Sequence, residues 1–104
     1  MINIQVFQTP TFVRKYKKLH IQEKHVVDQA IDAIIKNPTL GQAKKDDLTG
    51  VFVYKFKIHQ QEMLLAYQWD PKRRRLLTLG VHENFYRDLK KHKHLTFDVP
   101  HPLF

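Results

Sequence analysis

The sequence predicts one α+β domain in which a helical hairpin lies across an antiparallel sheet. Two observations indicate this class. Between residues 10 and 36, apolar residues recur at the spacing of amphipathic helices, whereas three apolar and aromatic runs separated by short polar turns occupy residues 51–81. A length of 104 residues without internal repeats is that of a single domain, which we take as residues 1–104.

The N-terminal region predicts a strand followed by a helix. Three apolar residues alternate with other side chains, as expected of a half-buried strand: Ile2, Ile4 and Val6. Thr9-Pro10 then marks the start of a helix. The apolar face of this helix recurs at positions i, i+4 and i+7: Phe12, Tyr16 and Leu19.

A second amphipathic helix follows after a very short link. Its apolar residues fit the spacing i, i+3, i+4, i+7 and i+8: Val27, Ala30, Ile31, Ile34 and Ile35. Asn37-Pro38 ends this helix, because the residue before a proline disfavours the helical conformation. Two helices joined so closely are expected to form an antiparallel hairpin.

Three strands are predicted after a connecting loop at residues 38–50. They are Val51–Ile58, Met63–Trp69 and Leu76–Val81. With the N-terminal strand they make an antiparallel sheet of about four strands. A short C-terminal helix is expected over Glu83–Lys91. The tail at residues 92–104 contains two prolines and no clear period, so we expect it to be loosely docked or disordered.

The composition restricts the chemistry and the location of the protein. There is no cysteine, which excludes disulfides, thiol nucleophiles and thiolate metal sites and is compatible with a reducing cytoplasm. No segment approaches the roughly 18 apolar residues of a membrane helix, and the N-terminus lacks the pattern of a signal peptide. We therefore expect a soluble, cytoplasmic protein with no membrane partner.

The chain is strongly basic. Eighteen Lys and Arg against ten Asp and Glu give a net charge of +8 and a pI near 9.8. Such a charge attracts phosphate backbones or an acidic protein. The positive residues come in local groups: Lys15, Lys17 and Lys18; Lys44 and Lys45; Arg73, Arg74 and Arg75; Lys90, Lys91 and Lys93. Any one group alone is more typical of a solvated face.

Lys55 and Lys57 share one face of their predicted strand, because side chains alternate with a period of two. The aromatic residues of the same strand point to the other face, toward the core. Together with Arg73–Arg75 on a neighbouring hairpin arm, the two lysines suit binding of phosphate oxygens. Ordinary solvent-facing lysines are the alternative interpretation.

His82 is the candidate for proton transfer. It follows the last predicted strand, and loops at strand ends often carry functional groups. Neutral histidine has a pKa suited to proton transfer near pH 7. Four neighbours within about one helical turn are positioned to orient it or to bind substrate: Glu83, Asn84, Tyr86 and Arg87. The alternative is a half-exposed capping or packing residue.

Metal-dependent chemistry is not favoured. His92 and His94 lie two residues apart, but no carboxylate or second histidine pair stands at a recognised ligand spacing. The phosphate-loop, dinucleotide and serine-nucleophile motifs are absent as well. We therefore expect no metal and no other cofactor.

Three groups of short motifs follow one another along the second half of the chain. They are Leu48-Thr49-Gly50 before Val53-Tyr54-Lys55-Phe56-Lys57-Ile58, then Leu64-Leu65-Ala66-Tyr67, and then Leu79-Gly80-Val81-His82-Glu83. In order and spacing they resemble the RelE/ParE superfamily of bacterial type II toxins. The resemblance covers nearly the whole domain. It implies a RelE-like fold and a cognate antitoxin protein as partner.

The superfamily has two functional branches. RelE-like members cut messenger RNA in the ribosomal decoding site, whereas ParE-like members poison DNA gyrase without nuclease residues. Lys55 and Lys57 match the paired strand lysines of RelE. Gly80-Val81-His82 followed by Phe85 is similar to a C-terminal pattern of YafQ-like ribonucleases. Both matches favour the nuclease branch.

Two positions depart from the RelE pattern. Leu64 stands where RelE has a phosphate-stabilising arginine, and Tyr86 lies two positions before its C-terminal tyrosine. A ParE-like gyrase inhibitor that acts by binding alone and a non-catalytic basic RNA-binding domain are therefore the alternatives.

The resemblance implies an mRNA endoribonuclease that works on the ribosome, with mRNA and the ribosome as partners. Cleavage would need no metal and would proceed by attack of a 2′-hydroxyl on the adjacent phosphate. The expected catalytic residues are His82, Lys55, Lys57 and Tyr86. The expected RNA- and phosphate-binding residues are Arg73, Arg74, Arg75, Arg87, Lys44, Lys45 and Lys90.

Overall fold

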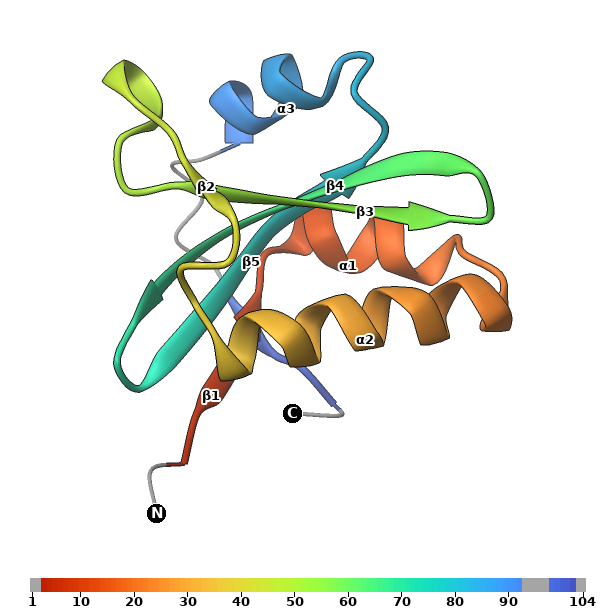
Figure 1. Ribbon diagram of the computed structural model, residues 1–104, viewed down its shortest axis with the longest axis horizontal. Helices are drawn as coiled ribbons and strands as arrows, with labels where there is room; N and C mark the ends of the chain where they lie inside the picture. Colours follow the sequence, from red (N-terminus) through yellow and green to blue (C-terminus); the bar gives the residue numbers. More distant parts are fainter. Residues whose placement is uncertain (1–2, 93–97, 103–104) are drawn as a thin grey trace.

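The computed structural model describes residues 3–92 and 98–102 and has a sheet with helices on both faces (Figure 1). Its elements in chain order are β1 (Gln5–Gln8), α1 (Pro10–Lys17), α2 (Ile21–Lys36), β2 (Gln42–Ala43), a 3-10 helix (Asp46–Leu48), β3 (Phe52–Ile58), β4 (Gln61–Asp70), β5 (Arg73–Gly80), α3 (Phe85–His92) and β6 (Val99–Pro100). No helix within the described ranges is long and apolar enough to cross a membrane.

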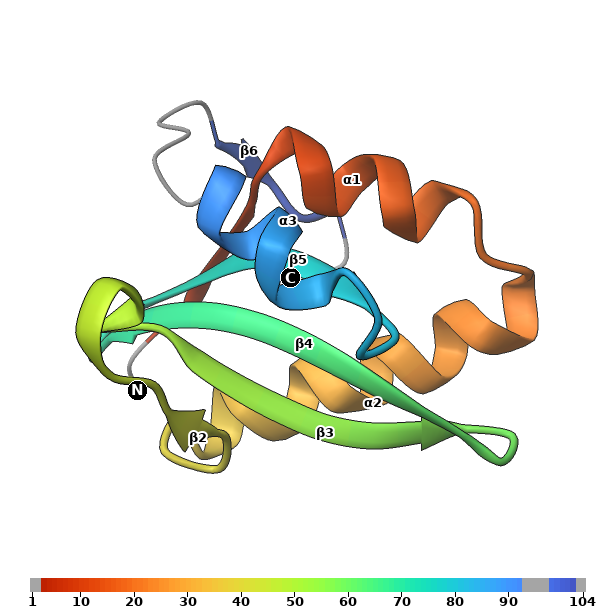
Figure 2. The ribbon, with the colours of Figure 1, turned by 90° about the horizontal axis from the view of Figure 1, so that it is seen from above.

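The sheet has the strand order β2-β3-β4-β5-β1-β6. β1 runs parallel to β5, and the other neighbouring strands are antiparallel. The α1–α2 hairpin covers one face of the sheet and α3 covers the other (Figure 2). The predicted α+β class, the helical hairpin and the short C-terminal helix are confirmed.

The predicted count of about four strands is wrong, because β2 and β6 bring the sheet to six. Each of these two strands is only two residues long, which is too short for an alternating pattern to be visible in the sequence. β2 lies within the segment predicted as a loop, and β6 lies within the predicted tail.

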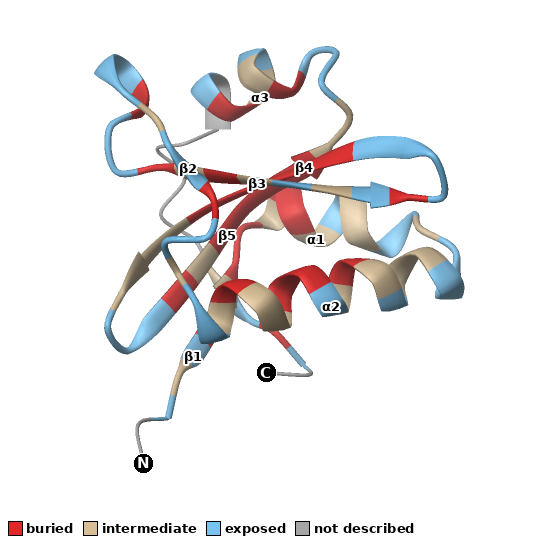
Figure 3. Cartoon of the chain, viewed as in Figure 1, coloured by how far each residue is buried: buried red, intermediate tan, exposed pale blue. Residues whose placement is uncertain are grey.

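Two apolar cores lie on opposite faces of the sheet. The larger residues of the hairpin-side core include Phe12, Ile31, Ile34, Leu65, Tyr67 and Leu76. The core under α3 contains Leu48, Val51, Val53, Leu64, Ala66, Leu77, Phe85 and Leu89. Figure 3 shows buried residues along β4 and on the side of α2 that faces the sheet.

Helix α1 begins at Thr9-Pro10, as predicted. The backbone N–H of Phe12 donates to Thr9 Oγ1 at 3.1 Å, which satisfies one of the unpaired donors of the first turn. The Thr9 hydroxyl donates in turn to the carbonyl oxygen of Leu77 at 2.6 Å. The helix cap is therefore also a link to β5, and it fixes where the rest of α1 lies over the sheet.

Arg74 is a buried cation at the C-terminal end of α2, with 3% of its surface exposed. Its Nε donates to the carbonyl of Ile34 at 3.0 Å and its Nη2 to that of Ile35 at 2.8 Å. A positive charge at this end complements the helix dipole and pairs carbonyls that the helix itself leaves open. The prediction that Arg74 binds phosphate is corrected, because its guanidinium is buried and already donates to these backbone carbonyls.

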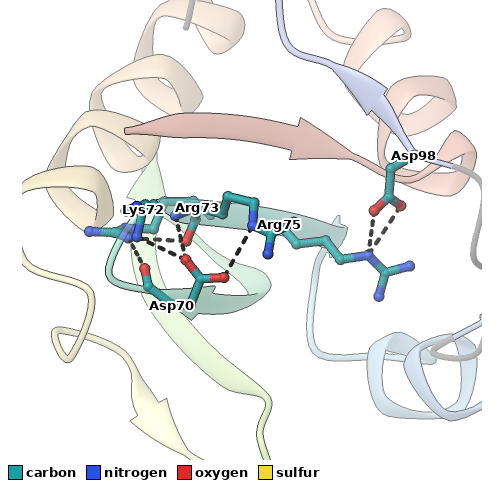
Figure 4. Close-up of polar contacts among 6 residues, drawn as sticks. Asp70, Lys72, Arg73, Arg75 and Asp98 are labelled. Atoms are coloured by element: carbon teal, nitrogen blue, oxygen red, sulfur yellow. Dashed lines mark hydrogen bonds and ion pairs between the residues drawn. The ribbon is translucent and has the colours of Figure 1, made fainter. Parts of the chain in front are cut away.

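The described part of the tail, residues 98–102, belongs to the sheet. β6 pairs antiparallel with β1, and the His101 N–H donates to the carbonyl of Val6 at 2.9 Å. The Arg75 guanidinium donates through Nε to the carboxylate of Asp98 at 2.8 Å (Figure 4). The expectation of a loosely docked tail does not describe these residues.

The His101 ring is buried beside α1 and α2. It meets the Tyr16 ring edge-on, with the ring centroids 5.7 Å apart. Burial lowers the pKa of His101, an effect that the negative charge of Asp28 partly opposes. The Tyr16 hydroxyl donates to Asp28 Oδ1 at 2.7 Å, and burial together with this bond raises the pKa of Tyr16.

Replacing Arg74 with Met is expected to lower the free energy of unfolding by about 2–3 kcal/mol, because buried carbonyls at the end of α2 lose their donors. Urea denaturation measures the loss. Arg73→Met is the matched control, since the Arg73 side chain is 63% exposed and its surface ion pair with Asp70 contributes about 0–1 kcal/mol. Equal losses for the two variants would contradict the capping role.

Acidification is expected to destabilise the fold through His101. The ordinary pKa of histidine, 6.5, applies to the unfolded chain, and the folded value lies below it. The stability that neutral His101 contributes is therefore complete above about pH 6.5 and is lost as the pH falls toward and through the folded pKa. Thermal unfolding at neutral and mildly acidic pH tests this. The drop in Tm should be smaller for His101→Leu, and an equal drop would exclude His101 as the cause.

Candidate functional site

Lys55 and Lys57 lie on the face of the sheet that carries α3. Val53 in the same strand is buried in the core under α3, and the alternation of β3 places both lysines on this face. Both side chains are exposed. Ile58 is buried in the opposite core, so the predicted division of the two faces agrees with the structure.

A transverse row connects Lys55 with the end of β5. Lys55 lies opposite Leu64, and Leu64 lies opposite Gly80. Because neighbouring strands are about 4.8 Å apart, the backbones of Lys55 and Gly80 are separated by about 10 Å. His82 follows two residues after Gly80 and is exposed. The strand lysines and the histidine therefore stand at the same end of this face.

A tight turn before α3 presents His82 to Tyr86. Asn84 adopts a left-handed conformation with φ of 65°, and the N–H of Phe85 donates to the carbonyl of His82 at 3.2 Å. The imidazole and phenol rings then meet at 67°, with their centroids 5.6 Å apart. Lys44 approaches from the segment after β2, with Nζ 5.1 Å from the centre of the Tyr86 ring. Two predicted site residues, His82 and Lys44, are thus grouped around the ring of a third, Tyr86.

Lys15 is a member of this region that the sequence did not single out. Its Nζ donates to Thr78 Oγ1 at 3.1 Å and lies 3.5 Å from Asp88 Oδ2 in α3. A Cβ added at Gly80 would lie 3.8 Å from the same ammonium group. In the sequence Lys15 is one of several cations on the polar side of a helix. Only the packing of α1 against β5 distinguishes it from the others.

A β-bulge determines which way the end of β5 faces. The pairing of β4 and β5 shifts between Ala66 and Tyr67, so that Leu77 has no partner in the register. Beyond the bulge Leu79 is buried in the hairpin-side core, and Gly80 faces Phe85 of α3. Without the bulge, Leu79 would face α3 and Gly80 would face the α1–α2 hairpin.

The remaining predicted phosphate ligands fall into two groups. Around α3, Lys90 Nζ lies 3.7 Å from Asp47, Arg87 is exposed with Nε 3.9 Å from Asp88, and Lys45 is exposed. A second group lies at the start of β5, about 20 Å from Gly80 by strand geometry. There Arg73 pairs with Asp70 and Arg75 with Asp98 (Figure 4). Arg75 also donates to Gln68. The structure does not bring these arginines to His82.

A groove of about 660 Å³ adjoins the site on the hairpin side. Its apolar walls are formed by Leu19, Ile58, Met63, Leu79 and Val81, and Lys15 and Gly80 lie at its border with the site. Among the described side chains, those of residues 3–90 and 98–102, no cluster of three or more His, Asp or Glu is placed to hold a metal ion. The pair His92 and His94 falls outside the side chains that the structure describes.

Comparison with known proteins places the chain in a family. Residues 6–90 match the family model of the ParE-like toxin of type II bacterial toxin-antitoxin systems. No curated protein matches the sequence. Among solved structures, the free E. coli toxin RelE, in a mutant form, is similar with a TM-score of 0.65 and 14% identity, over 91% of this chain and 100% of that one.

Two further structures share the fold. The toxin-antitoxin complex RelBE of E. coli contains a chain with a TM-score of 0.60 and 15% identity, over 75% of this chain and 95% of that one. The YoeB/ParE toxin from Agrobacterium tumefaciens gives a TM-score of 0.58 at 13% identity, over 76% and 99%. The expected RelE-like fold is confirmed. The chain belongs to the RelE/ParE superfamily, in the family of ParE-like toxins of type II bacterial toxin-antitoxin systems.

Proposed function

We propose that this chain is a toxin that cleaves messenger RNA on the ribosome. The observation that carries the proposal is the grouping of His82, Tyr86 and Lys44 on an exposed face that also holds Lys55 and Lys57. This set contains groups that transfer protons and groups that stabilise negative charge, which are the requirements of phosphodiester cleavage. All of them come from elements held by the sheet.

The proposed reaction is an internal transfer within the RNA. The 2′-hydroxyl loses its proton to His82, its oxygen forms a bond to the adjacent phosphorus, and the bond from phosphorus to the 5′-oxygen breaks. Tyr86 gives its phenolic proton to the leaving 5′-oxygen. The products are a 2′,3′-cyclic phosphate and a 5′-hydroxyl, so no water and no metal are required. Lys55 and Lys57 stabilise the additional negative charge on the phosphate in the transition state.

The RNA backbone is proposed to run across the α3 side of the molecule. Lys44, Lys45, Arg87 and Lys90 surround α3 and would bind the phosphates next to the cleaved bond. Arg73 and Arg75 at the other end of β5 are suited only to more distant phosphates or to ribosomal RNA. Arg74 is left out because it caps α2.

A gyrase inhibitor that acts by binding alone is the second candidate. Leu64 favours it, because this fully buried apolar residue lies in the centre of the row where the nuclease resemblance expects an arginine. The family description as ParE-like points the same way. This candidate assigns no role to the imidazole of His82.

We also propose an acidic antitoxin as partner. One of the similar structures is a toxin-antitoxin complex, and the net charge of +8 favours a negatively charged protein. The association rate of such a complex is expected to fall as salt is added.

His82→Ala is expected to slow mRNA cleavage on programmed bacterial ribosomes by about a hundredfold or more, because the group that accepts the 2′-hydroxyl proton is removed. Mapping of new 5′ ends measures the rate. His25→Ala is the control, since His25 is an exposed histidine on α2. Cleavage by folded His82→Ala at the wild-type rate would falsify the assignment. If the wild type does not cut at all, a gyrase supercoiling assay tests the second candidate.

Tyr86→Phe distinguishes the role of the Tyr86 hydroxyl group from that of its aromatic ring. The variant keeps the aromatic contacts with His82 and Lys44 and should remain folded, yet cleavage should slow by about tenfold or more because no proton reaches the 5′-oxygen. Tyr86→Leu removes the ring as well and should be slower still. If Tyr86→Phe retains full activity while Tyr86→Leu does not, the ring has only a positioning role and the proposed acid is wrong.

A further inference from the structure

The groove on the hairpin side has the size and the composition of a ligand site. Its volume of about 660 Å³ falls within the range of about 300–1,000 Å³ that is typical of sites for small molecules. Such sites are mostly apolar and carry a few polar groups that fix the orientation of the ligand. Beside its apolar walls, this groove is lined by five polar residues: Lys15, Glu23, His59, Gln60 and Gln61.

The groove lies at the end of the molecule that carries His82. The link between α1 and α2 and the turn between β3 and β4 both lie at this end (Figure 2). Leu79, Gly80 and Val81 line the groove, and His82 is the next residue in the chain. A ligand in the groove is therefore adjacent to the proposed site of cleavage.

Lys15 supplies a positive charge at the border between the groove and the site. Its Nζ donates to Thr78 Oγ1 at 3.1 Å and lies 3.5 Å from Asp88 Oδ2. These contacts engage two of the three N–H donors of the ammonium group, and the side chain is 32% exposed. The ammonium group is thus held in place and still accessible, which suits it to binding a phosphate oxygen.

Glu23 brings a negative charge to the groove at the start of α2. Its Oε1 accepts from the backbone N–H of His20 at 2.8 Å, which fixes the carboxylate in the first turn of the helix. An ionised carboxylate only accepts hydrogen bonds, so it favours a ligand that presents an amino group. The side-chain amides of Gln60 and Gln61 both donate and accept, and they add polar partners from the β3–β4 turn.

These features fit a nucleotide better than a purely apolar ligand. The flat faces of a nucleobase pack against apolar side chains, and its edge forms hydrogen bonds. Adenine, guanine and cytosine carry an amino group that donates to a carboxylate, whereas uracil presents carbonyl oxygens there. The net charge of +8 attracts an anionic ligand, and the phosphate can pair with Lys15. An apolar segment of a protein would use neither Lys15 nor Glu23.

We propose that the groove binds one nucleotide of the RNA, next to the cleaved bond. The base lies between the apolar walls with its amino group at Glu23, and the phosphate lies at Lys15. The assignment to the RNA substrate rests on the proposed nuclease function, whereas the binding of a nucleotide does not. The groove then selects the base beside the cut and disfavours uracil, whose carbonyl oxygens face the carboxylate.

Adenosine 5′-monophosphate is the probe, and methyl NMR of the 104-residue chain is the measurement. The nucleotide should shift the methyl signals of Ile58, Met63, Leu79 and Val81. Nuclear Overhauser effects should connect the base protons with the Met63 methyl group. Uridine 5′-monophosphate should bind several-fold more weakly. Absence of these contacts at high concentrations of adenosine 5′-monophosphate overturns the proposal.

Lys15→Met tests the contact with the phosphate. The wild type should bind adenosine 5′-monophosphate several-fold more tightly than adenosine. Lys15→Met should bind the two equally, because no ammonium group remains to pair with the phosphate. Lys17→Met is the matched control, since Lys17 is an exposed lysine of the same helix and does not line the groove. A Lys15→Met protein that keeps the full preference for the phosphorylated form overturns this contact.

Glu23→Gln tests the selection of the base. The variant keeps the capping box, because Gln at this position also accepts from the N–H of His20, but it loses the negative charge. The wild-type preference for adenosine 5′-monophosphate over uridine 5′-monophosphate should therefore shrink toward equal affinities. Thermal unfolding confirms that the variant is folded. An unchanged preference in folded Glu23→Gln overturns the role of the carboxylate.

Two simpler compounds distinguish other occupants. Free indole imitates an apolar side chain of a partner protein. If indole shifts the methyl signals of the groove and nucleotides do not, the groove is a docking surface for a protein and the proposal is overturned. If inorganic phosphate alone reproduces the shifts caused by the nucleotide, the attraction is one of charge without recognition of a base, which also overturns it.

Cleavage on programmed ribosomes separates this inference from the proposed function. If the wild type cuts mRNA, few mapped 5′ ends should lie beside uracil, and Glu23→Gln should relax this bias. Cuts without such a bias would overturn the role of the groove and leave the nuclease function intact. If the wild type cuts nothing, contacts of adenosine 5′-monophosphate in the groove still support nucleotide binding, and only the proposed function fails.

Discussion

The burial of β4 on both faces is the constraint on which the rest of the structure depends. Residues 63–67 are buried without interruption, so the strand needs a cover on each side. The α1–α2 hairpin supplies one, and Phe85 and Leu89 of α3 supply the other. Burying a side chain of this size contributes about 1.5–3 kcal/mol, whereas a surface ion pair such as Lys90 with Asp47 contributes about 0–1 kcal/mol. Apolar packing, not charge, holds α3 in place.

This explains why the candidate site has an apolar centre and a charged rim. Leu64 and Ala66 must face α3 to be buried, so the middle of this sheet face has no place for a charged side chain. The polar groups come instead from the margins: Lys15 in α1, Lys44 after β2, Lys55 and Lys57 in β3, and His82 and Tyr86 around the start of α3. Their relative positions depend on the sheet that joins these elements.

Much of the fold follows from local patterns in the sequence. The period of α2, the Thr9-Pro10 start of α1 and the three apolar runs predict the hairpin and the central strands, because each pattern lies within one element. β2 and β6 were missed because a strand of two residues shows no periodic pattern.

The candidate site was harder to predict than the fold. Lys15 lies at the site because α1 packs against β5. Arg74 does not, because its guanidinium binds carbonyls at the end of α2. The bulge in β5 reverses the face to which Gly80 points. These are tertiary effects with no local signal.

β6 has a consequence for how the protein assembles. It closes the far side of the sheet with two residues, one of which is Pro100, a residue without an N–H to offer a further strand. β3 pairs with β2 only at Phe52 and Val53, so in the described part of the chain the sheet can lengthen at β3 but not beyond β6. A filament built edge to edge requires two receptive edges on every subunit, and this sheet has one. Growth by strand pairing stops after one addition, which favours a finite complex over a fibre even at high concentrations of the protein.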